Sequence, residues 1–306
     1  MTAVTIPSPA DLGIRLIDTP GPDAQSADGP GPDAPAADTP DHDTVPLDAL
    51  VRVALRRNPK RAHLLVSTVL AKHVPTVPAL ALLAGELLGA RVADVLAPEP
   101  DGTPRVGPEA IRRCTALLRD TERLGPERTE QDATTFRTAL ATRRPDLPDV
   151  RTIGYAETAT ALGVLVAQAL GSASLHSTRL HPGDRTPAAA FEEAHSHATA
   201  HLLLPDDPDW LRPGGTVVLV DDELSTGATA RGTVRALHAL VPQARWVIAS
   251  LVDLRSDADR AAMDALADEL GAPVDVVALG SGRVELPEGL TAVAADLIAS
   301  AAGPAA

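Results

Sequence analysis

Short apolar runs alternate with helical stretches from residue 150 to the end of the chain. The runs are rich in Val, Ile and Leu and predict strands, whereas the stretches between them have the apolar spacing of helices. This alternation predicts an α/β fold, a mainly parallel sheet of about five strands with helices on both faces. Ligands on such sheets bind at the carboxyl ends of the strands. The strands are expected at residues 151–155, 173–177, 216–220, 245–252 and 274–279, and the helices at 158–170, 229–240, 257–270 and 290–300.

Residues 1–46 differ from the rest of the chain in composition. They contain nine prolines, eight aspartates and a single arginine. Such a segment buries too little apolar surface to offset its ordering entropy, so we expect a disordered acidic tail with at most a short strand at residues 14–17. The tail could bind a partner, or it could act only as a solubilising segment.

Residues 47–306 are expected to form the folded domain. Residues 98–150 within it are rich in Arg, Glu, Asp and Pro and predict a helical hood inserted before the main sheet. The hood is expected to contain helices at 108–124 and 131–143, and the part of the domain before it is expected to contain helices at 47–57 and 77–96 around a strand at 63–67.

Composition argues against several classes of function. The net charge of −14 argues against general nucleic-acid binding. The single cysteine, Cys114, excludes a disulfide framework and fits a reducing cytosol, so a cytoplasmic location is expected. No cationic start followed by an apolar run opens the chain, and the apolar stretch at residues 77–90 contains Glu86 and is too short to span a bilayer. We therefore expect neither a nucleic-acid nor a membrane partner.

The most specific motif runs from residue 217 to residue 229. An apolar strand ends at Asp221 and Asp222, and a short loop then enters the next helix. A helix N-terminus offers free backbone N–H groups and the positive end of the dipole, and Gly227 lets the backbone approach a ligand closely. The two carboxylates suit sugar hydroxyls or a Mg²⁺ ion, so the motif predicts a site for ribose-5-phosphate. An acidic pair at the strand end of a nucleotide-binding or response-regulator-like protein is the alternative. The phosphate would be bound by Ser225, Thr226, Gly227, Ala228 and Thr229.

Residues 218–229 resemble the phosphoribosyl-pyrophosphate (PRPP) signature of type I phosphoribosyltransferases, because strand, acidic pair and Thr-Gly-x-Thr loop occur in that order. The resemblance implies that Asp221 and Asp222 bind the ribose 2′- and 3′-hydroxyls and the Mg²⁺ cofactor, and that the loop binds the 5′-phosphate. It also implies the fold of this family and a transfer of the phosphoribosyl group with release of pyrophosphate.

A polar turn follows the strand expected at residues 63–67. The family has a pyrophosphate-binding loop at this position, which by resemblance would contain Ser67, Thr68 and Lys72. Lys72 is one of only two lysines in a chain whose Lys and Arg residues total 27. Its ammonium could neutralise pyrophosphate oxygens. The alternative is an ordinary turn at a helix start with a solvated lysine.

The segment 154–160 also follows an expected strand and opens a helix. The family places here a loop that meets the acceptor or the pyrophosphate. Glu157 could act as an acid–base group or bind a metal, and Tyr155 could stack on a base. The alternative is a capped helix start, with Thr158 or Thr160 as the N-cap.

Residues 176–201 hold five of the nine histidines. Type I enzymes have a mobile loop here that closes over the reacting centre. The resemblance suggests that its arginines and histidines bind pyrophosphate and that a glutamate deprotonates the nucleophile. A Zn²⁺ site of His195, His197 and His201, or a polar loop with solvated histidines, are the alternatives. The candidates for pyrophosphate binding are Arg179, Arg185, His195 and His197, and those for the base are Glu192 and Glu193.

Over residues 47–300 the chain is similar to the phosphoribosyltransferase-like proteins of bacterial tellurite-resistance and stress-response gene clusters. That similarity implies PRPP and a small-molecule, nucleobase-like acceptor as partners, together with a homodimer and a separate protein in place of a C-terminal domain. Two alternatives belong to other classes of protein. One is a regulator that senses PRPP or a nucleotide without turnover, and the other is an interaction protein that uses the acidic tail and the hood.

Overall fold

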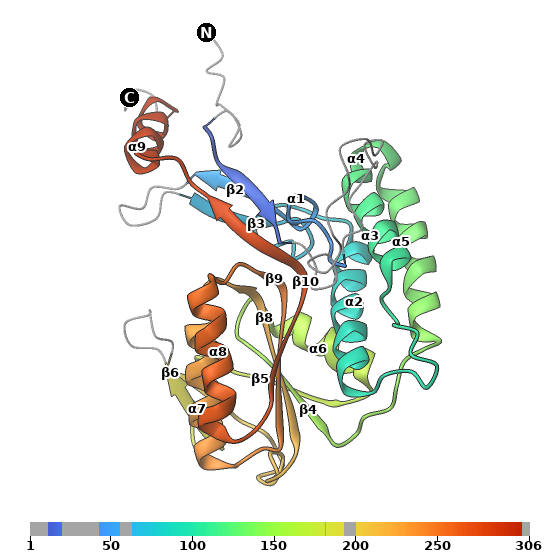
Figure 1. Ribbon diagram of the computed structural model, residues 1–306, viewed down its shortest axis with the longest axis vertical. Helices are drawn as coiled ribbons and strands as arrows, with labels where there is room; N and C mark the ends of the chain where they lie inside the picture. Colours follow the sequence, from blue (N-terminus) through green and yellow to red (C-terminus); the bar gives the residue numbers. More distant parts are fainter. Residues whose placement is uncertain (1–11, 20–42, 56–62, 181, 193–199, 302–306) are drawn as a thin grey trace, which may run out of the picture.

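A computed structural model describes five stretches of the protein, residues 12–19, 43–55, 63–180, 182–192 and 200–301. Most of the predicted tail and the segment 193–199 lie outside these described residues. The fold is α/β, and its central sheet lies between two layers of helices (Figure 1).

The central sheet has six strands within the described residues, in the order β1-β10-β9-β8-β4-β5. Five of them are parallel, as the sequence predicts, and β1 joins the edge antiparallel to β10. β1 is formed by the short strand anticipated inside the acidic tail, and Leu16 pairs with Val284. The strands are β1 Arg15–Asp18, β4 Val150–Gly154, β5 Ala173–His176, β8 Thr216–Leu224, β9 Arg245–Asp253 and β10 Val274–Glu285.

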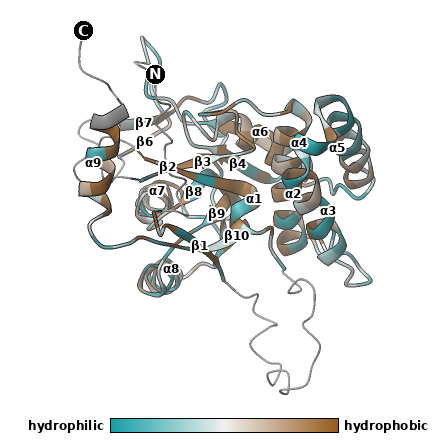
Figure 2. Ribbon diagram, turned by 90° about the horizontal axis from the view of Figure 1, so that it is seen from above, coloured by the Kyte–Doolittle hydropathy of each residue, from teal (hydrophilic) through white to brown (hydrophobic). Residues whose placement is uncertain are grey.

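Helices cover both faces of the sheet. α2 (Pro78–Leu96) and α6 (Thr160–Leu170) lie on one face, and α7 (Ala228–Leu240) and α8 (Asp257–Leu270) lie on the other (Figure 2). The last helix, α9 (Leu290–Ala301), follows β10. No helix within the described stretches has the length and apolar character needed to cross a membrane.

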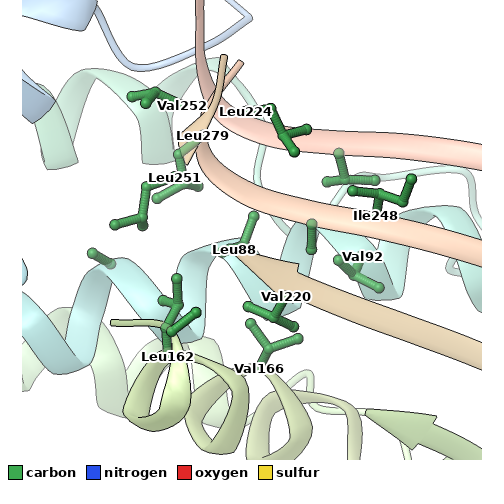
Figure 3. Packing of buried hydrophobic residues seen from close by; sticks show 14 of the residues in the cluster. Leu88, Val92, Leu162, Val166, Val220, Leu224, Ile248, Leu251, Val252 and Leu279 are labelled. Atoms are coloured by element: carbon green, nitrogen blue, oxygen red, sulfur yellow. The ribbon is translucent and has the colours of Figure 1, made fainter. Parts of the chain in front are cut away.

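The core lies where α2 and α6 pack on the middle strands. Leu88 of α2, Val166 of α6 and Val220 of β8 belong to this cluster, and all three are fully buried (Figure 3). With only 2% aromatic residues, aliphatic side chains fill this space. Close packing at such a core fixes the positions of the strand ends that carry the site.

The hood is present as predicted, with one extra break. α3 (Pro108–Arg119) and α4 (Thr121–Leu124) are separated at Asp120, where the sequence predicts one continuous helix, and α5 (Pro126–Ala141) follows. The hood is joined to α2 by two hydrogen bonds from Arg137 to the Glu86 carboxylate, at 3.0 and 2.7 Å.

The helix predicted at residues 47–57 is wrong. Only α1 (Leu47–Leu50) is helical, and the chain then forms β2 (Val51–Leu55), which pairs antiparallel with β3 (His63–Ser67). Val51 and Val53 are buried and Arg52 between them is exposed, which is the period of a strand. β2 and β3 form a separate sheet, so β3 does not belong to the central sheet, and of its residues only Leu65 and Val66 are buried.

A second hairpin lies in the region predicted as a long polar loop. β6 (Ala189–Glu192) pairs with β7 (Ala200–Leu203), with Phe191 opposite His201. Thr178 bridges to Leu202, which ties the hairpin to the end of β5. Phe191, Leu203 and Ala189 are buried, so the apolar residues of this stretch have a packing role that its polar neighbours obscure in the sequence.

Candidate functional site

The acidic pair lies at the carboxyl end of β8. The sequence predicts a strand that ends at residue 220, but β8 continues to Leu224 and pairs there with β9. Asp221 and Asp222 are therefore held by the sheet, with Asp221 opposite Ser250 of β9. The Asp222 N–H donates to Asp221 Oδ1 at 2.9 Å.

The two carboxylates differ in their surroundings. Burial raises the pKa of Asp221 well above its usual range, and the neighbouring negative charge of Asp222 raises it further. Asp222 is compensated instead, because the Lys72 Nζ lies 3.2 Å from its Oδ2 and the Thr158 hydroxyl donates to its Oδ1 at 3.1 Å. A cation that reaches Asp221 would therefore favour the ionised form of this carboxyl, which burial disfavours.

The loop after β8 enters α7 through a left-handed residue. Gly227 has φ of +67° and is the N-cap of the helix, a conformation that disfavours side chains. The Thr226 Oγ1 accepts from the Ala228 N–H at 3.3 Å, and the Arg231 guanidinium donates to the Thr226 carbonyl at 2.8 Å. Ser225 and Thr226 are exposed, and Thr229 is half-buried. The loop thus presents hydroxyls, a helix N-terminus and a nearby arginine, the groups that bind a phosphate.

The predicted pyrophosphate loop lies beside the acidic pair. Ser67 and Lys72 line a cavity of about 20 Å³ together with Asp222 and Glu223. Ala71, next to Lys72, has φ of +52°, a conformation uncommon for a residue with a side chain. Thr68 points elsewhere, because its hydroxyl donates to the carbonyls of Ala49 and Leu50 at 2.7 and 3.0 Å.

The segment 154–160 brings a third strand end to the site. Thr158 contacts Asp222, whereas α6 begins at Thr160 with Ala159 as its N-cap and no capping side chain, so neither threonine is the predicted N-cap. Glu157 is exposed. Tyr155 is buried, and its ring lies edge-on to Phe191 with centroids 5.9 Å apart, which places it in the core and not on an open face where a base could stack.

The histidine-rich region is only partly described. Glu193, His195 and His197 lie outside the described residues, so their predicted roles stay predictions. His201 is fully buried, and both its ring nitrogens lie within hydrogen-bond distance of protein groups, Ser177 Oγ at 2.8 Å and Arg179 Nε at 3.1 Å. Arg185 donates to the Leu204 carbonyl at 2.8 Å and to Asp206 at 2.9 Å. Within the described stretches, no group of three or more His, Cys, Asp or Glu is arranged to hold a metal ion.

A buried charged cluster at the end of β9 was not predicted from the sequence. Burial alone would raise the pKa of Asp253, but two hydrogen bonds from Arg255 at 2.9 Å, and the charges of Arg255 and Arg260, lower it below its usual value. Arg255 also packs behind the loop of α7, since a Cβ on Gly227 would lie 3.1 Å from its Cδ. The available signal was Asp253 itself, a carboxylate directly after a long apolar run, as Asp221 is after residues 217–220.

Comparisons with known proteins complete the description of the site. A family model described as phosphoribosyl transferase matches residues 50–283, more than half of the 306-residue chain. Among curated proteins there is no match.

Similar solved structures include the adenine phosphoribosyltransferase of Rhodothermus marinus, with 21% identity over 64% of this chain and 98% of that chain and a TM-score of 0.32. The adenine phosphoribosyltransferase of Leishmania donovani has 16% identity over 53% of this chain and 68% of that chain, with a TM-score of 0.34. The orotate phosphoribosyltransferase of Aeropyrum pernix has 20% identity over 44% of this chain and 60% of that chain, with a TM-score of 0.28.

Proposed function

The chain belongs to the phosphoribosyl transferase family, and from this membership we propose that it transfers the phosphoribosyl group of PRPP to a small-molecule acceptor with release of pyrophosphate. The observation that carries the proposal is the convergence on Asp222. Lys72 reaches it from the loop after β3 and Thr158 reaches it from the segment after β4. Two loops separated in the sequence thus meet at the acidic pair of β8, and the loop that enters α7 follows the same strand, which supports a ligand with a sugar, a phosphate and a pyrophosphate.

Each part of PRPP has a matching group in the proposal. Asp221 and Asp222 bind the ribose hydroxyls, and the residues from Ser225 to Thr229 bind the 5′-phosphate at the start of α7. Lys72, Ser67 and Arg179 bind the pyrophosphate, and charge-assisted hydrogen bonds stabilise it as negative charge develops on the leaving group. Glu157 is exposed beside Thr158 and is the described candidate for a group that moves a proton to or from the acceptor. A role for Thr68 in pyrophosphate binding has less support, because its hydroxyl already donates to the Ala49 carbonyl of α1.

Mg²⁺ fits the donors at this site. Asp221 and Asp222 supply carboxylate oxygens, the ligands that Mg²⁺ prefers, and two protein carboxylates are its usual complement where the substrate phosphates provide the rest. When bound, the ion would neutralise the pyrophosphate oxygens and stabilise the ionised form of Asp221.

The related group of proteins, the cellular location and the oligomeric state are proposed from the sequence. The order of motifs supports a relation to the phosphoribosyltransferase-like proteins of tellurite-resistance and stress-response gene clusters. The free, buried Cys114 supports a cytoplasmic location. A homodimer is proposed by analogy with type I phosphoribosyltransferases.

The decisive experiment is calorimetric titration of PRPP with Mg²⁺ into the protein and into the Asp221→Asn, Asp222→Asn double variant. Loss of two charged acceptors should weaken binding roughly 100-fold, at about 1.5 kcal/mol for each hydrogen bond to a charged group. Asp264→Asn with Asp268→Asn is the matched control, because it removes the same charge from exposed positions on α8. Unchanged affinity in the site variant would contradict the assignment.

Two further measurements separate the parts of the proposal. Thr226→Ala with Thr229→Ala should weaken ribose-5-phosphate as well as PRPP, whereas the exposed pair Thr135→Ala with Thr138→Ala on α5 should change neither. A screen of a metabolite pool for PRPP-dependent pyrophosphate release then identifies the acceptor. Tight PRPP binding without pyrophosphate release from any pool would favour a PRPP-sensing regulator instead.

A further inference from the structure

His201 is a fully buried imidazole at the junction between β7 and the end of β5. Its Nε2 lies 3.1 Å from the Arg179 Nε, and its Nδ1 lies 2.8 Å from the Ser177 Oγ. A guanidinium N–H can only donate, so His201 Nε2 is the acceptor of that bond. The ring hydrogen of the neutral imidazole then lies on Nδ1 and is donated to Ser177.

The chain of hydrogen bonds continues into the predicted active site. Ser177 Oγ also accepts the Ala156 N–H at 2.9 Å, and Ser177 is itself fully buried. Ala156 immediately precedes Glu157 and Thr158, and Thr158 contacts Asp222. His201 therefore connects Arg179, a predicted pyrophosphate ligand, to the segment that reaches the acidic pair.

The His201 ring is held in one orientation by the two aromatic side chains beside it. Phe191 of β6 stacks on it with centroids 5.2 Å apart and an angle of 14°, and Tyr155 lies edge-on at 6.1 Å and 87°. The chain has only one tyrosine and two phenylalanines, and two of these three residues contact His201. A ring fixed in this way can hold the Arg179 side chain, which donates a hydrogen bond to it, in one direction.

We propose that His201 is a positioning residue for pyrophosphate recognition, which fixes the direction of the Arg179 guanidinium and its place relative to the 154–158 segment. The inference rests on the proposed function, because it takes Arg179 as a ligand of the PRPP pyrophosphate. Holding the arginine at Nε before the substrate arrives reduces the side-chain entropy lost on binding. His201 itself does not contact the substrate, so its effect on binding passes through Arg179.

The test compares three probes: Mg²⁺-PRPP, inorganic pyrophosphate with Mg²⁺, and ribose-5-phosphate. His201→Phe keeps a ring on Phe191 and removes both polar contacts, so PRPP and pyrophosphate should bind about 10-fold more weakly, while ribose-5-phosphate should bind as before. His201→Gln, whose amide oxygen can accept from Arg179, should recover most of the loss. His238→Phe is the matched control, because it removes from α7 a ring nitrogen that accepts the N–H of Trp246 on β9, and it leaves the contacts of His201 in place.

The outcomes separate the inference from the proposed function. Absence of PRPP binding in the wild-type protein overturns the proposed function. If the wild type binds PRPP, then unchanged pyrophosphate affinity in His201→Phe overturns the inference, and so does an equal loss for all three probes, which would mark a structural role. Where His201→Phe does not fold, Ser177→Ala is tested with and without Arg179→Met. The inference requires that Ser177→Ala weakens pyrophosphate only when Arg179 is present, and equal effects in both backgrounds overturn it.

Discussion

The Nζ of Lys72 lies 3.2 Å from the Oδ2 of Asp222, and the Asp222 side chain is only 14% exposed. The two residues are 150 positions apart in the sequence. Both residues line a cavity of about 20 Å³, which has room for about one water molecule and not for a ribose. Since Asp222 is a proposed ligand of the sugar, PRPP would have to displace Lys72 from it, and the displaced ammonium would then be available to the pyrophosphate.

Replacing Lys72 should therefore affect two ligands differently. We expect Lys72→Met to weaken PRPP about 10-fold, because a charge-assisted contact to the pyrophosphate is lost. Ribose-5-phosphate should bind equally well or up to a few-fold more tightly, because it no longer competes with a part-exposed ion pair worth about 1 kcal/mol at most. Calorimetry with both ligands measures the difference, and Arg235→Met, which breaks an exposed ion pair with Glu269, is the control. An equal loss for both ligands would show that Lys72 acts through the fold.

The raised pKa of Asp221 predicts how stability depends on pH. Burial and the neighbouring charge of Asp222 favour the protonated form in the folded protein, so this residue stabilises the fold at low pH and ceases to do so as the pH rises through its folded pKa. We expect Asp221→Asn to melt at a higher temperature than the ligand-free wild type at pH 8. The increase should be about 2–4 °C for each kcal/mol by which the substitution raises the free energy of unfolding. The difference should shrink as the pH falls toward 4 and vanish only at about pH 2–3, below the usual pKa of an aspartate, where the wild-type carboxyl is protonated in both the folded and the unfolded state.

Thermal unfolding between pH 4 and pH 8 measures this effect, with the exposed Asp264→Asn as the control. A variant that is less stable than the wild type at pH 8 would contradict the raised pKa. The same shift predicts that PRPP binding with Mg²⁺ releases a proton from Asp221. Titrations in buffers with different ionisation enthalpies would detect that proton.

The sheet and hood were predictable because their signals are local. Residues 217–220 are a continuous apolar run that is buried on both sides, and α3 buries one stripe of Ile111, Cys114 and Leu117. The segment 47–57 was not predictable in this way, because the spacing of its apolar residues fits a helix and a strand alike. Its pairing with β3, not its own pattern, decides the outcome.

The residues of the candidate site were predictable from the sequence, but their contacts were not. Asp221 and the α7 loop follow from the pattern of strand, acidic pair and glycine. The contacts of Lys72 and Thr158 with Asp222 depend on the paths of two loops, which no local pattern specifies. Tyr155 illustrates the same limit, since an aromatic residue after a strand can face a ligand or, as here, pack in the core against Phe191.

Adding a single methyl group where α6 packs on β4 should lower the stability of the protein. A Cβ on Gly163 would lie 2.7 Å from the Gly154 Cα and 3.0 Å from its N, and these backbone atoms cannot rotate away. We expect Gly163→Ala to destabilise the protein by about 1–3 kcal/mol and to shift the 155–159 segment, so that PRPP affinity also falls. Gly232→Ala on α7 is the matched control, because no atom lies within 4 Å of its added Cβ. The control should be neutral or stabilising by up to about 1 kcal/mol, and a Gly163→Ala variant as stable as the control would contradict the close contact.

The only cysteine of the chain reports on the hood. Cys114 is buried on the inner face of α3, and burial raises the pKa of its thiol to about 12. At pH 8 only about one thiol in 10⁴ would be ionised, and the thiolate is the reactive form. We therefore expect a chromogenic disulfide reagent to leave the native protein unmodified over the time in which it modifies the denatured protein completely.

Any slow reaction of the native protein then measures opening of the hood. Ile111→Ala removes a buried neighbour on the same face of α3 and should destabilise the hood by about 2–5 kcal/mol, so the reaction should become faster. Leu240→Ala is the control, because Leu240 is exposed at the end of α7, outside the hood. Immediate stoichiometric modification of the native wild type would mean that α3 does not bury Cys114 in solution, and the hood would then have to pack differently on α2.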